Sequence, residues 1–227
     1  MTDDKPKSLL EYLESYVTEN RKNLFQKVLN ERTRHFTSVL EDIYQPHNSS
    51  AVMRSCDIFG IQDVHVIENK YSSKVSRHVA KGSQKWLTFH RYNQKENNTL
   101  DCIQYLKSTG YQSIATTPHA DSSLLPDFDF TKKSAFVFGK EKEGVSELVK
   151  EQADGFLKIP MVGFTESLNI SVAAAIVLND VTTRVKKSDI QWQLSDLEKS
   201  NLYQEWIEKS IKNVEKIKEY FYNNNFN

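Results

Sequence analysis

Residues 45–57 combine residue types that can act on a polar substrate. They read Gln-Pro-His-Asn-Ser-Ser-Ala-Val-Met-Arg-Ser-Cys-Asp. We expect Pro46 to end the preceding strand and Asn48 to cap a helix, because asparagine is a preferred N-cap residue. Arg54 then lies in the second turn among small and apolar residues, where its guanidinium needs a partner. That partner is either a carboxylate of the protein, which would make Arg54 structural, or a substrate.

A glycine-containing loop follows a candidate buried strand. The apolar residues 136–138 lead into Gly139, four residues separate Gly139 from Gly144, and a helix start follows. Glycine lets a ligand approach the backbone closely. The loop has neither the Gly-Lys-Ser/Thr ending of a Walker A motif nor a Gly-x-Gly-x-x-Gly pattern, and Glu141 and Glu143 would repel a phosphate. It gives little support to a nicotinamide cofactor or a nucleotide phosphate, and an ordinary strand–loop–helix turn is the alternative.

A third segment joins a strand end to a helix rich in small residues. Ile159-Pro160-Met161 is followed by Ser167-Leu168-Asn169 and then by three consecutive alanines, residues 173–175. Backbone N–H groups at the start of a helix can bind polar groups of a ligand. The alternative is that Ser167 or Asn169 simply caps the helix.

Charge is unevenly distributed although the net charge is zero. The chain has 30 Lys+Arg and 30 Asp+Glu, which excludes a uniformly basic, nucleic-acid-coating protein. Residues 70–95 nevertheless hold seven basic residues, several aromatic ones and no acidic one. RNA is usually held by basic groups on its phosphates and aromatic groups on its bases, so the stretch favours RNA contact over a merely solvated face. We expect the contacts from Lys74, Arg77, Lys81 and Lys85.

These motifs require a scaffold, and the chain shows one between residues 36 and 187. Short apolar runs alternate there with helical patterns, which predicts an α/β domain with a mainly parallel sheet. Helical patterns without strands precede and follow it. We therefore expect a helical N-terminal extension over residues 1–35, the α/β domain over 36–187 and a C-terminal helical extension over 188–227. The expected strands are 36–40, 64–67, 86–89, 113–116, 134–138 and 155–159, and the expected helices of the domain are 48–59, 99–108, 146–152 and 168–186.

The composition is that of a folded protein of a reducing compartment. Of the 227 residues, 38% are hydrophobic, enough for a sizeable core. Cys56 and Cys102 are far apart and neither belongs to a Cys-x-x-Cys pair, which argues against a zinc site and a disulfide scaffold. The N-terminus has no apolar signal core, and no apolar run approaches the roughly 18 residues of a membrane span. We expect a cytoplasmic protein without a metal.

Taken together and in order, the three motifs resemble one family. Asn48…Arg54, Phe138-Gly139-x-Glu141-x-x-Gly144, and Ile159-Pro160-Met161 with Ser167-Leu168-Asn169-x-Ser171-x-Ala173 are similar to the three motifs of the SpoU group of SPOUT-class RNA methyltransferases. The resemblance runs over about residues 39–184. Within the group, Pro46-His47-Asn48 is most similar to the TrmH family of tRNA (guanosine-18-2′-O)-methyltransferases.

The resemblance implies a fold, an assembly and a cofactor. SPOUT enzymes have an α/β fold whose C-terminal part forms a trefoil knot, and they are homodimers that bind S-adenosylmethionine in the knot without a metal. The short helical extensions resemble those of the tRNA enzymes rather than the extra RNA-binding domain of rRNA-directed members. Carried over by motif position, the cofactor would contact Thr116, Gly139, Ile159, Met161 and Leu168.

The implied reaction is methylation of the ribose 2′-OH of a guanosine in the D-loop of tRNA. By resemblance, Arg54 activates the hydroxyl, and Asn48, Glu141, Ser167 and Asn169 position Arg54 and the ribose. A guanidinium holds its proton tightly, so electrostatic stabilisation or phosphate clamping by Arg54 is an equally sound role. The alternatives are a ribosomal RNA or another tRNA nucleotide as target, or a catalytically silent RNA-binding protein on the same scaffold.

Overall fold

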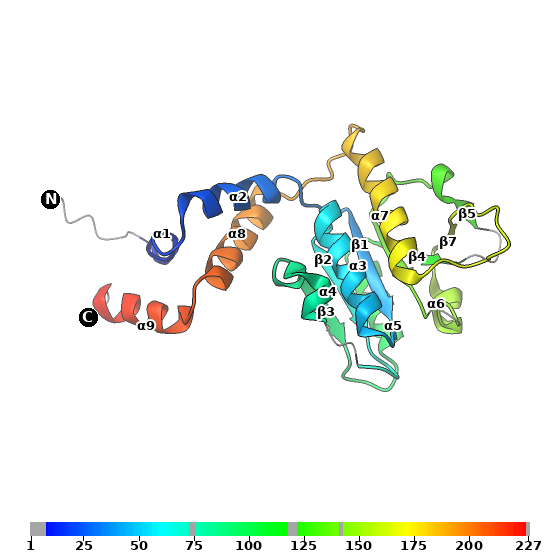
Figure 1. The fold of residues 1–227 in the computed structure, drawn as a ribbon, viewed down its shortest axis with the longest axis horizontal. Helices are drawn as coiled ribbons and strands as arrows, with labels where there is room; N and C mark the ends of the chain where they lie inside the picture. The colour runs from blue at the N-terminus through cyan, green and yellow to red at the C-terminus, as the bar shows by residue number, and fades with distance from the viewer. Residues whose placement is uncertain (1–7, 73–75, 118–121, 141–142, 226–227) are drawn as a thin grey trace. The chain divides into compact units, whose positions relative to one another are not determined.

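The computed structural model describes residues 8–72, 76–117, 122–140 and 143–225 (Figure 1). It divides into two compact units. The α/β unit comprises Thr33–Trp192, and the helical unit combines Met1–Arg32 with Gln193–Asn227. No helix of the described residues is long and apolar enough to cross a membrane.

The α/β unit is built on a seven-stranded sheet in which every pair of neighbouring strands is parallel. The strand order is β3-β2-β1-β6-β4-β7-β5, so the expected α/β class with a mainly parallel sheet is confirmed. The strands are β1 (Phe36–Glu41), β2 (Asp63–Ile67), β3 (Thr88–Tyr92), β4 (Gln112–Thr116), β5 (Ser123–Leu124), β6 (Ser134–Phe138) and β7 (Gly155–Lys158).

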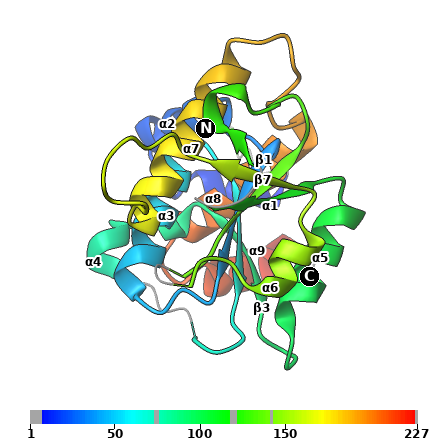
Figure 2. The same ribbon diagram turned by 90° about the vertical axis from the view of Figure 1, so that its right-hand side faces the viewer.

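Helices cover both faces of the sheet (Figure 2). On one face, α3 (Pro46–Phe59) and α7 (Ile170–Lys186) pack against each other and against β1 residues such as Leu40. On the other face, α5 (Asn98–Ser108) and α6 (Glu147–Gln152) cover Val39, the preceding residue of the same strand. Successive side chains of a strand point to opposite faces, so a doubly covered strand reads as a continuous apolar run.

Three sequence expectations about the first motif, the roles of Pro46 and Asn48 and the turn that holds Arg54, are wrong. α3 begins at Pro46, not after Asn48, and its N-cap is Gln45. Proline is favoured at the first helical position because an N–H group there has no partner within the helix, so its absence costs nothing. Pro46 accordingly starts the helix rather than ending β1. Asn48 therefore lies inside the first turn, where it is buried, and Arg54 lies in the third turn.

The third strand also differs from its expected place. β3 begins at Thr88 because a short 3-10 helix, η1 (Ser83–Lys85), precedes it, and Trp86 N–H closes that turn onto Ser83. The four-residue helix α4 (Arg77–Ala80), the 3-10 turn η2 (Leu125–Asp127) and the two-residue β5 were not expected.

The helical unit contains α1 (Leu9–Glu14), α2 (Glu19–Leu29), α8 (Asp196–Ser210) and α9 (Val214–Asn225). Its buried residues include Leu13, Phe25 and Trp206, and the Phe25 and Trp206 ring centroids lie 5.6 Å apart. The helical pattern after the α/β domain corresponds to two helices, α8 and α9. The chain leaves helical geometry at Ile211, and Asn213 has a φ of 58°.

Candidate active site

The strand order places a cavity where a parallel sheet is expected to bind a ligand. β1, β2 and β3 follow one another towards one edge of the sheet. β4 and β7 lie on the other side of β1, and β6 lies between β1 and β4. Ligands of open α/β sheets bind beyond the carboxyl ends of the strands at such a reversal. A cavity of about 330 Å³ lies there, at the ends of β4, β6 and β7.

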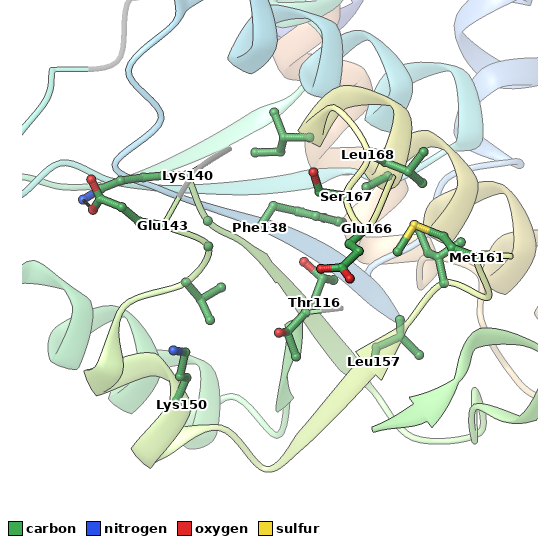
Figure 3. Close-up of a pocket in the computed structure, with 17 residues that line it drawn as sticks. Thr116, Phe138, Lys140, Glu143, Lys150, Leu157, Met161, Glu166, Ser167 and Leu168 are labelled. Carbon is green, nitrogen blue, oxygen red and sulfur yellow. Dashed lines mark hydrogen bonds and ion pairs between the residues drawn. The ribbon is translucent and has the colours of Figure 1, made fainter. Parts of the chain in front are cut away.

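The cavity brings together all five residues that the resemblance assigns to the cofactor: Thr116, Gly139, Ile159, Met161 and Leu168. Figure 3 shows Met161 and Leu168 on one side of it and Lys140 with Glu143 on the other. The Thr116 hydroxyl donates to Val137 O at 2.9 Å, which ties the ends of β4 and β6 together. The remaining lining residues are Thr117, Phe138, Lys140, Glu143, Gly144, Val145, Lys150, Leu157, Glu166, Ser167, Ile170 and Ala173.

The loop after β6 has a shape that only glycine allows. Lys140 and Gly144 exchange two backbone hydrogen bonds of 2.9 Å, which pinches the loop. A Cβ added to Gly139 would collide with the backbone of Gly144 and Val145, and Gly144 itself has a φ of 68°. The spacing of the two glycines thus reflects the close approach of the two loop ends as well as access to the cavity.

Glu41 holds this loop and was missed by the sequence analysis. It ends β1 and is buried, with its Oε2 accepting from Ser146 N–H at 2.8 Å. Its Oε1 accepts from the hydroxyls of Ser146 at 2.7 Å and Thr99 at 2.8 Å. Because Ser146 is also the N-cap of α6, Glu41 links the end of the glycine loop to the centre of the sheet.

An asparagine pair joins the first and third motifs. Asn169 caps α7 through its Oδ1, which accepts from Ser171 N–H at 2.8 Å, and its Nδ2 donates to Asn48 Oδ1 at 3.2 Å. The structure therefore brings Asn48 and Asn169 together, whereas Ser167 lies in the cavity lining. Glu141 is outside the described residues.

Arg54 lies in a different hollow, called the Arg54 hollow below, from the five residues that the resemblance assigns to the cofactor. It is exposed on α3 and lines a second depression of about 500 Å³ with His47, His78, Lys81 and Ser171. The two linings have no residue in common. The described lining of this second hollow contains no carboxylate, so its charged groups are all basic.

The cavity whose lining includes the residues that the resemblance assigns to the cofactor, called the cofactor cavity below, has mixed charge in contrast. Lys140 Nζ lies 2.7 Å from Glu143 Oε2, and this hydrogen bond lowers the pKa of the Glu143 carboxyl and raises the pKa of the Lys140 ammonium. Glu166 and Lys150 also reach the lining. The cavity thus combines two carboxylates and two ammonium groups with an apolar floor.

The structure revises the interpretation of the basic stretch. Arg91 Nη1 lies 3.4 Å from Glu68 Oε1, and Lys95 Nζ lies 2.8 Å from Asp101 Oδ2, so two of the seven charges are compensated by acidic residues just outside the stretch. Of the four residues expected to contact RNA, Lys81 lines the Arg54 hollow, and Lys85 is exposed with its Nζ 4.9 Å from the Trp86 ring centroid. Lys74 and the side chain of Arg77 lie outside the described residues.

The parallel sheet, the glycine loop and the asparagine-capped helix are the features on which the class of protein can be compared with known families. Residues 35–179 match the model of the SpoU rRNA Methylase family, and the chain belongs to that family. Over 215 residues it is 40% identical to a tRNA (guanosine(18)-2′-O)-methyltransferase of Borreliella burgdorferi, covering 95% of this chain and 97% of the relative. The enzyme of the same name from Thermus thermophilus is 37% identical over 161 residues, covering 71% and 81%.

Solved structures show the same fold. The A. aeolicus TrmH/SpoU tRNA modifying enzyme superposes with a TM-score of 0.75 at 28% identity, covering 86% of this chain and 98% of that one. The SpoU methyltransferase AviRb from Streptomyces viridochromogenes, crystallised with the cofactor AdoMet, matches with a TM-score of 0.60 at 22% identity, over 71% of this chain and 65% of that one.

Proposed function

We propose that this protein is an S-adenosylmethionine-dependent tRNA (guanosine(18)-2′-O)-methyltransferase. The observation that carries the proposal is the 40% identity to an enzyme of that name over nearly the full length of both chains. The motif residues support it, because Arg54, Asn48, Ser167 and Asn169 are all present. Their presence argues against a catalytically silent RNA-binding protein.

The cavity fits S-adenosylmethionine in size and chemistry. Its volume of about 330 Å³ falls in the usual range for small-molecule sites. Leu157, Ile159 and Leu168 provide an apolar surface for the adenine, and the paired ammonium and carboxylate groups suit a zwitterionic amino-acid tail. The bound cofactor supplies an electrophilic methyl group on a sulfonium. The residues that would hold it are those of the glycine loop and of the 159–169 segment that line the cavity.

The protein must stabilise the ribose oxygen as its proton leaves. A 2′-OH is a weak acid, and a preorganised positive charge beside the developing alkoxide lowers the barrier. Arg54 is suited to that role because a guanidinium keeps its proton and presents several donors. We assign Ser167, Asn48, Asn169 and Glu141 to positioning the ribose and Arg54.

The separation of the two hollows supports a homodimer. Because the Arg54 hollow and the cofactor cavity share no lining residue, we propose that Arg54 of one protomer acts at the cofactor cavity of its partner. Apolar side chains suited to an interface are exposed on the 159–169 segment and on α7. Val162 and Phe164 are fully exposed, and Val172 and Ile176 are 46% and 37% exposed.

We also propose the family's trefoil knot in this chain. Described residues of the segment that leads into β6 lie against the last helix of the α/β unit, which supports the proposal. Arg184 of α7 donates to Leu125 O at 3.1 Å and to Phe128 O at 2.7 Å.

The tRNA would meet the basic groups around Arg54 and Lys81. A tRNA substrate is consistent with a cytoplasmic enzyme.

Mapping of 2′-O-methylation at nucleotide resolution tests the proposed function. In tRNA and rRNA from cells with and without the gene, we expect methylation to disappear only at the D-loop guanosine on deletion. Purified protein with S-adenosylmethionine should restore it on unmodified tRNA. Loss at a ribosomal or another tRNA nucleotide, with the D-loop unchanged, would contradict the assignment of the target.

A further inference from the structure

Two exposed tyrosines form a pair beside the cofactor cavity, and neither belongs to the three motifs. Tyr44 follows β1 and Tyr71 follows β2, so both lie at the carboxyl edge of the sheet. Their ring centroids are 5.0 Å apart with the planes at 69°, an edge-to-face arrangement. Tyr44 is 70% exposed and Tyr71 is 38% exposed, which is high for aromatic side chains in contact with each other.

The backbone around this pair is held in place. Asp42 is buried and has a φ of 51°. Its Oδ1 accepts from the N–H groups of Asn69 at 2.7 Å and Lys70 at 2.8 Å, and from Tyr71 N–H at 3.4 Å. One buried carboxylate thus fixes the segment that carries Tyr71 against the end of β1. The backbone of Tyr71 is therefore held in place.

The pair is connected to the cofactor cavity through its charged rim. Lys140 Nζ lies 6.0 Å from the Tyr71 ring centroid, and Lys140 also lines the cavity. Lys70 is exposed and close enough to contribute to the lowered pKa of Glu143, another lining residue. Tyr44, Tyr71, Lys70 and Lys140 therefore form one surface, which we call the tyrosine subsite, at the edge of the cavity.

We propose that the tyrosine subsite stacks a nucleobase of the RNA strand that enters the cofactor cavity, with Lys70 facing the phosphates of that strand. The inference rests on the proposed function. Aromatic faces beside ammonium groups are the combination by which proteins hold unpaired bases, and every base has a face to stack. A ribose that reaches the cavity brings its neighbouring bases to the rim, where these rings are exposed.

The test compares three variants with the wild-type protein, each purified to homogeneity. Y44A/Y71A removes both rings, Y44F/Y71F keeps them, and Y105A removes a tyrosine of α5 that is exposed to a similar extent, 41%. The probe is an unmodified full-length tRNA transcript at fixed salt. Removing one stacking partner weakens binding by about 5- to 150-fold. We therefore expect the tRNA affinity of Y44A/Y71A to fall at least about fivefold. Y44F/Y71F and Y105A should stay near wild type.

Two further measurements on the same samples separate stacking from other roles. Affinity for S-adenosylmethionine and the sedimentation coefficient should be unchanged in Y44A/Y71A. Wild-type tRNA affinity in Y44A/Y71A would overturn the inference, and so would dissociation of a dimer, which would make the pair a protein interface. A wild-type protein that binds S-adenosylmethionine but neither binds nor methylates tRNA would instead overturn the proposed function.

Discussion

The cofactor cavity and the Arg54 hollow differ in how completely one chain builds them. The cavity is bordered by residues of two loops, with Glu41 holding the end of one and Asn169 the end of the other. The Arg54 hollow is an open depression on α3, lined by basic groups that face outwards. A small molecule can therefore be bound by one chain alone. The basic hollow is suited to a large anionic partner, and the proposed dimer would bring it to a cavity.

The largest expected effect comes from Arg54→Ala. If Arg54 stabilises the developing alkoxide, the change should lower kcat on tRNA by on the order of 100- to 1,000-fold, as for other lost electrostatic donors. S-adenosylmethionine affinity and melting temperature should stay the same, because Arg54 is exposed and does not line the cavity. Steady-state methylation measures kcat, and calorimetry measures the cofactor affinity and the melting temperature. Near wild-type turnover would remove Arg54 from the chemistry.

The cavity should be sensitive at Gly139. An alanine there must displace the backbone of Gly144 and Val145, and such overpacking typically costs about 1–3 kcal/mol. We expect the loop to shift and S-adenosylmethionine affinity to fall at least about tenfold, since 1.4 kcal/mol corresponds to a factor of ten.

Gly163→Ala is the matched control for Gly139→Ala. It lies in the other loop, and its added Cβ would come no closer than 4.0 Å to Thr165 N. Isothermal titration calorimetry should show near wild-type cofactor affinity for this variant. Equal affinities for the two alanine variants would mean that the pinched loop does not shape the cavity.

A smaller effect is expected for Glu41→Gln, which keeps the side-chain shape and removes the charge. Glu41 accepts hydrogen bonds from Ser146 N–H and from two hydroxyls, and bonds to a charged group each contribute roughly 1.5–3 kcal/mol. The amide can replace only part of this, so we expect a loss of about 2 kcal/mol in the free energy of unfolding. Urea unfolding with and without S-adenosylmethionine measures it.

Thr99→Val serves as the control for Glu41→Gln, since it removes one of the hydroxyl donors and leaves Ser146 attached to Glu41. Its cofactor affinity should be nearer to wild type than that of Glu41→Gln. The opposite ranking would show that Glu41 does not act through the glycine loop.

The sequence predicted the buried strands of the sheet better than it predicted the residues that hold the site in place. The strand at residues 134–138 has the expected bounds, because a buried parallel strand is a continuous apolar run that here ends at a glycine. Glu41 was missed because a carboxylate at a strand end looks like a solvated charge until its donors, which are distant in sequence, come together. Asn48 was misplaced because it was read as the cap while proline at the first helical position sets the start.

Pairing with residues just outside the basic stretch also limited the charge analysis. The stretch 70–95 contains no carboxylate, yet Arg91 and Lys95 find Glu68 and Asp101 next to it in space. The motif residues for the cofactor could be placed from the resemblance, and they meet in one cavity. That Arg54 lies outside this cavity could not be read from spacing, because it depends on which side of α3 faces the sheet.

The most direct test of this account mixes two inactive proteins. Arg54→Ala keeps the cavity and loses the guanidinium, whereas Ala173→Phe fills the cavity with a ring and keeps Arg54. If the two half-sites meet across a dimer, mixing should restore guanosine-18 methylation. The expected level is about a quarter of wild type, since half of randomly exchanged dimers are mixed and each holds one complete site. No recovery, in a mixture shown by tagged subunits to have exchanged, would contradict the account.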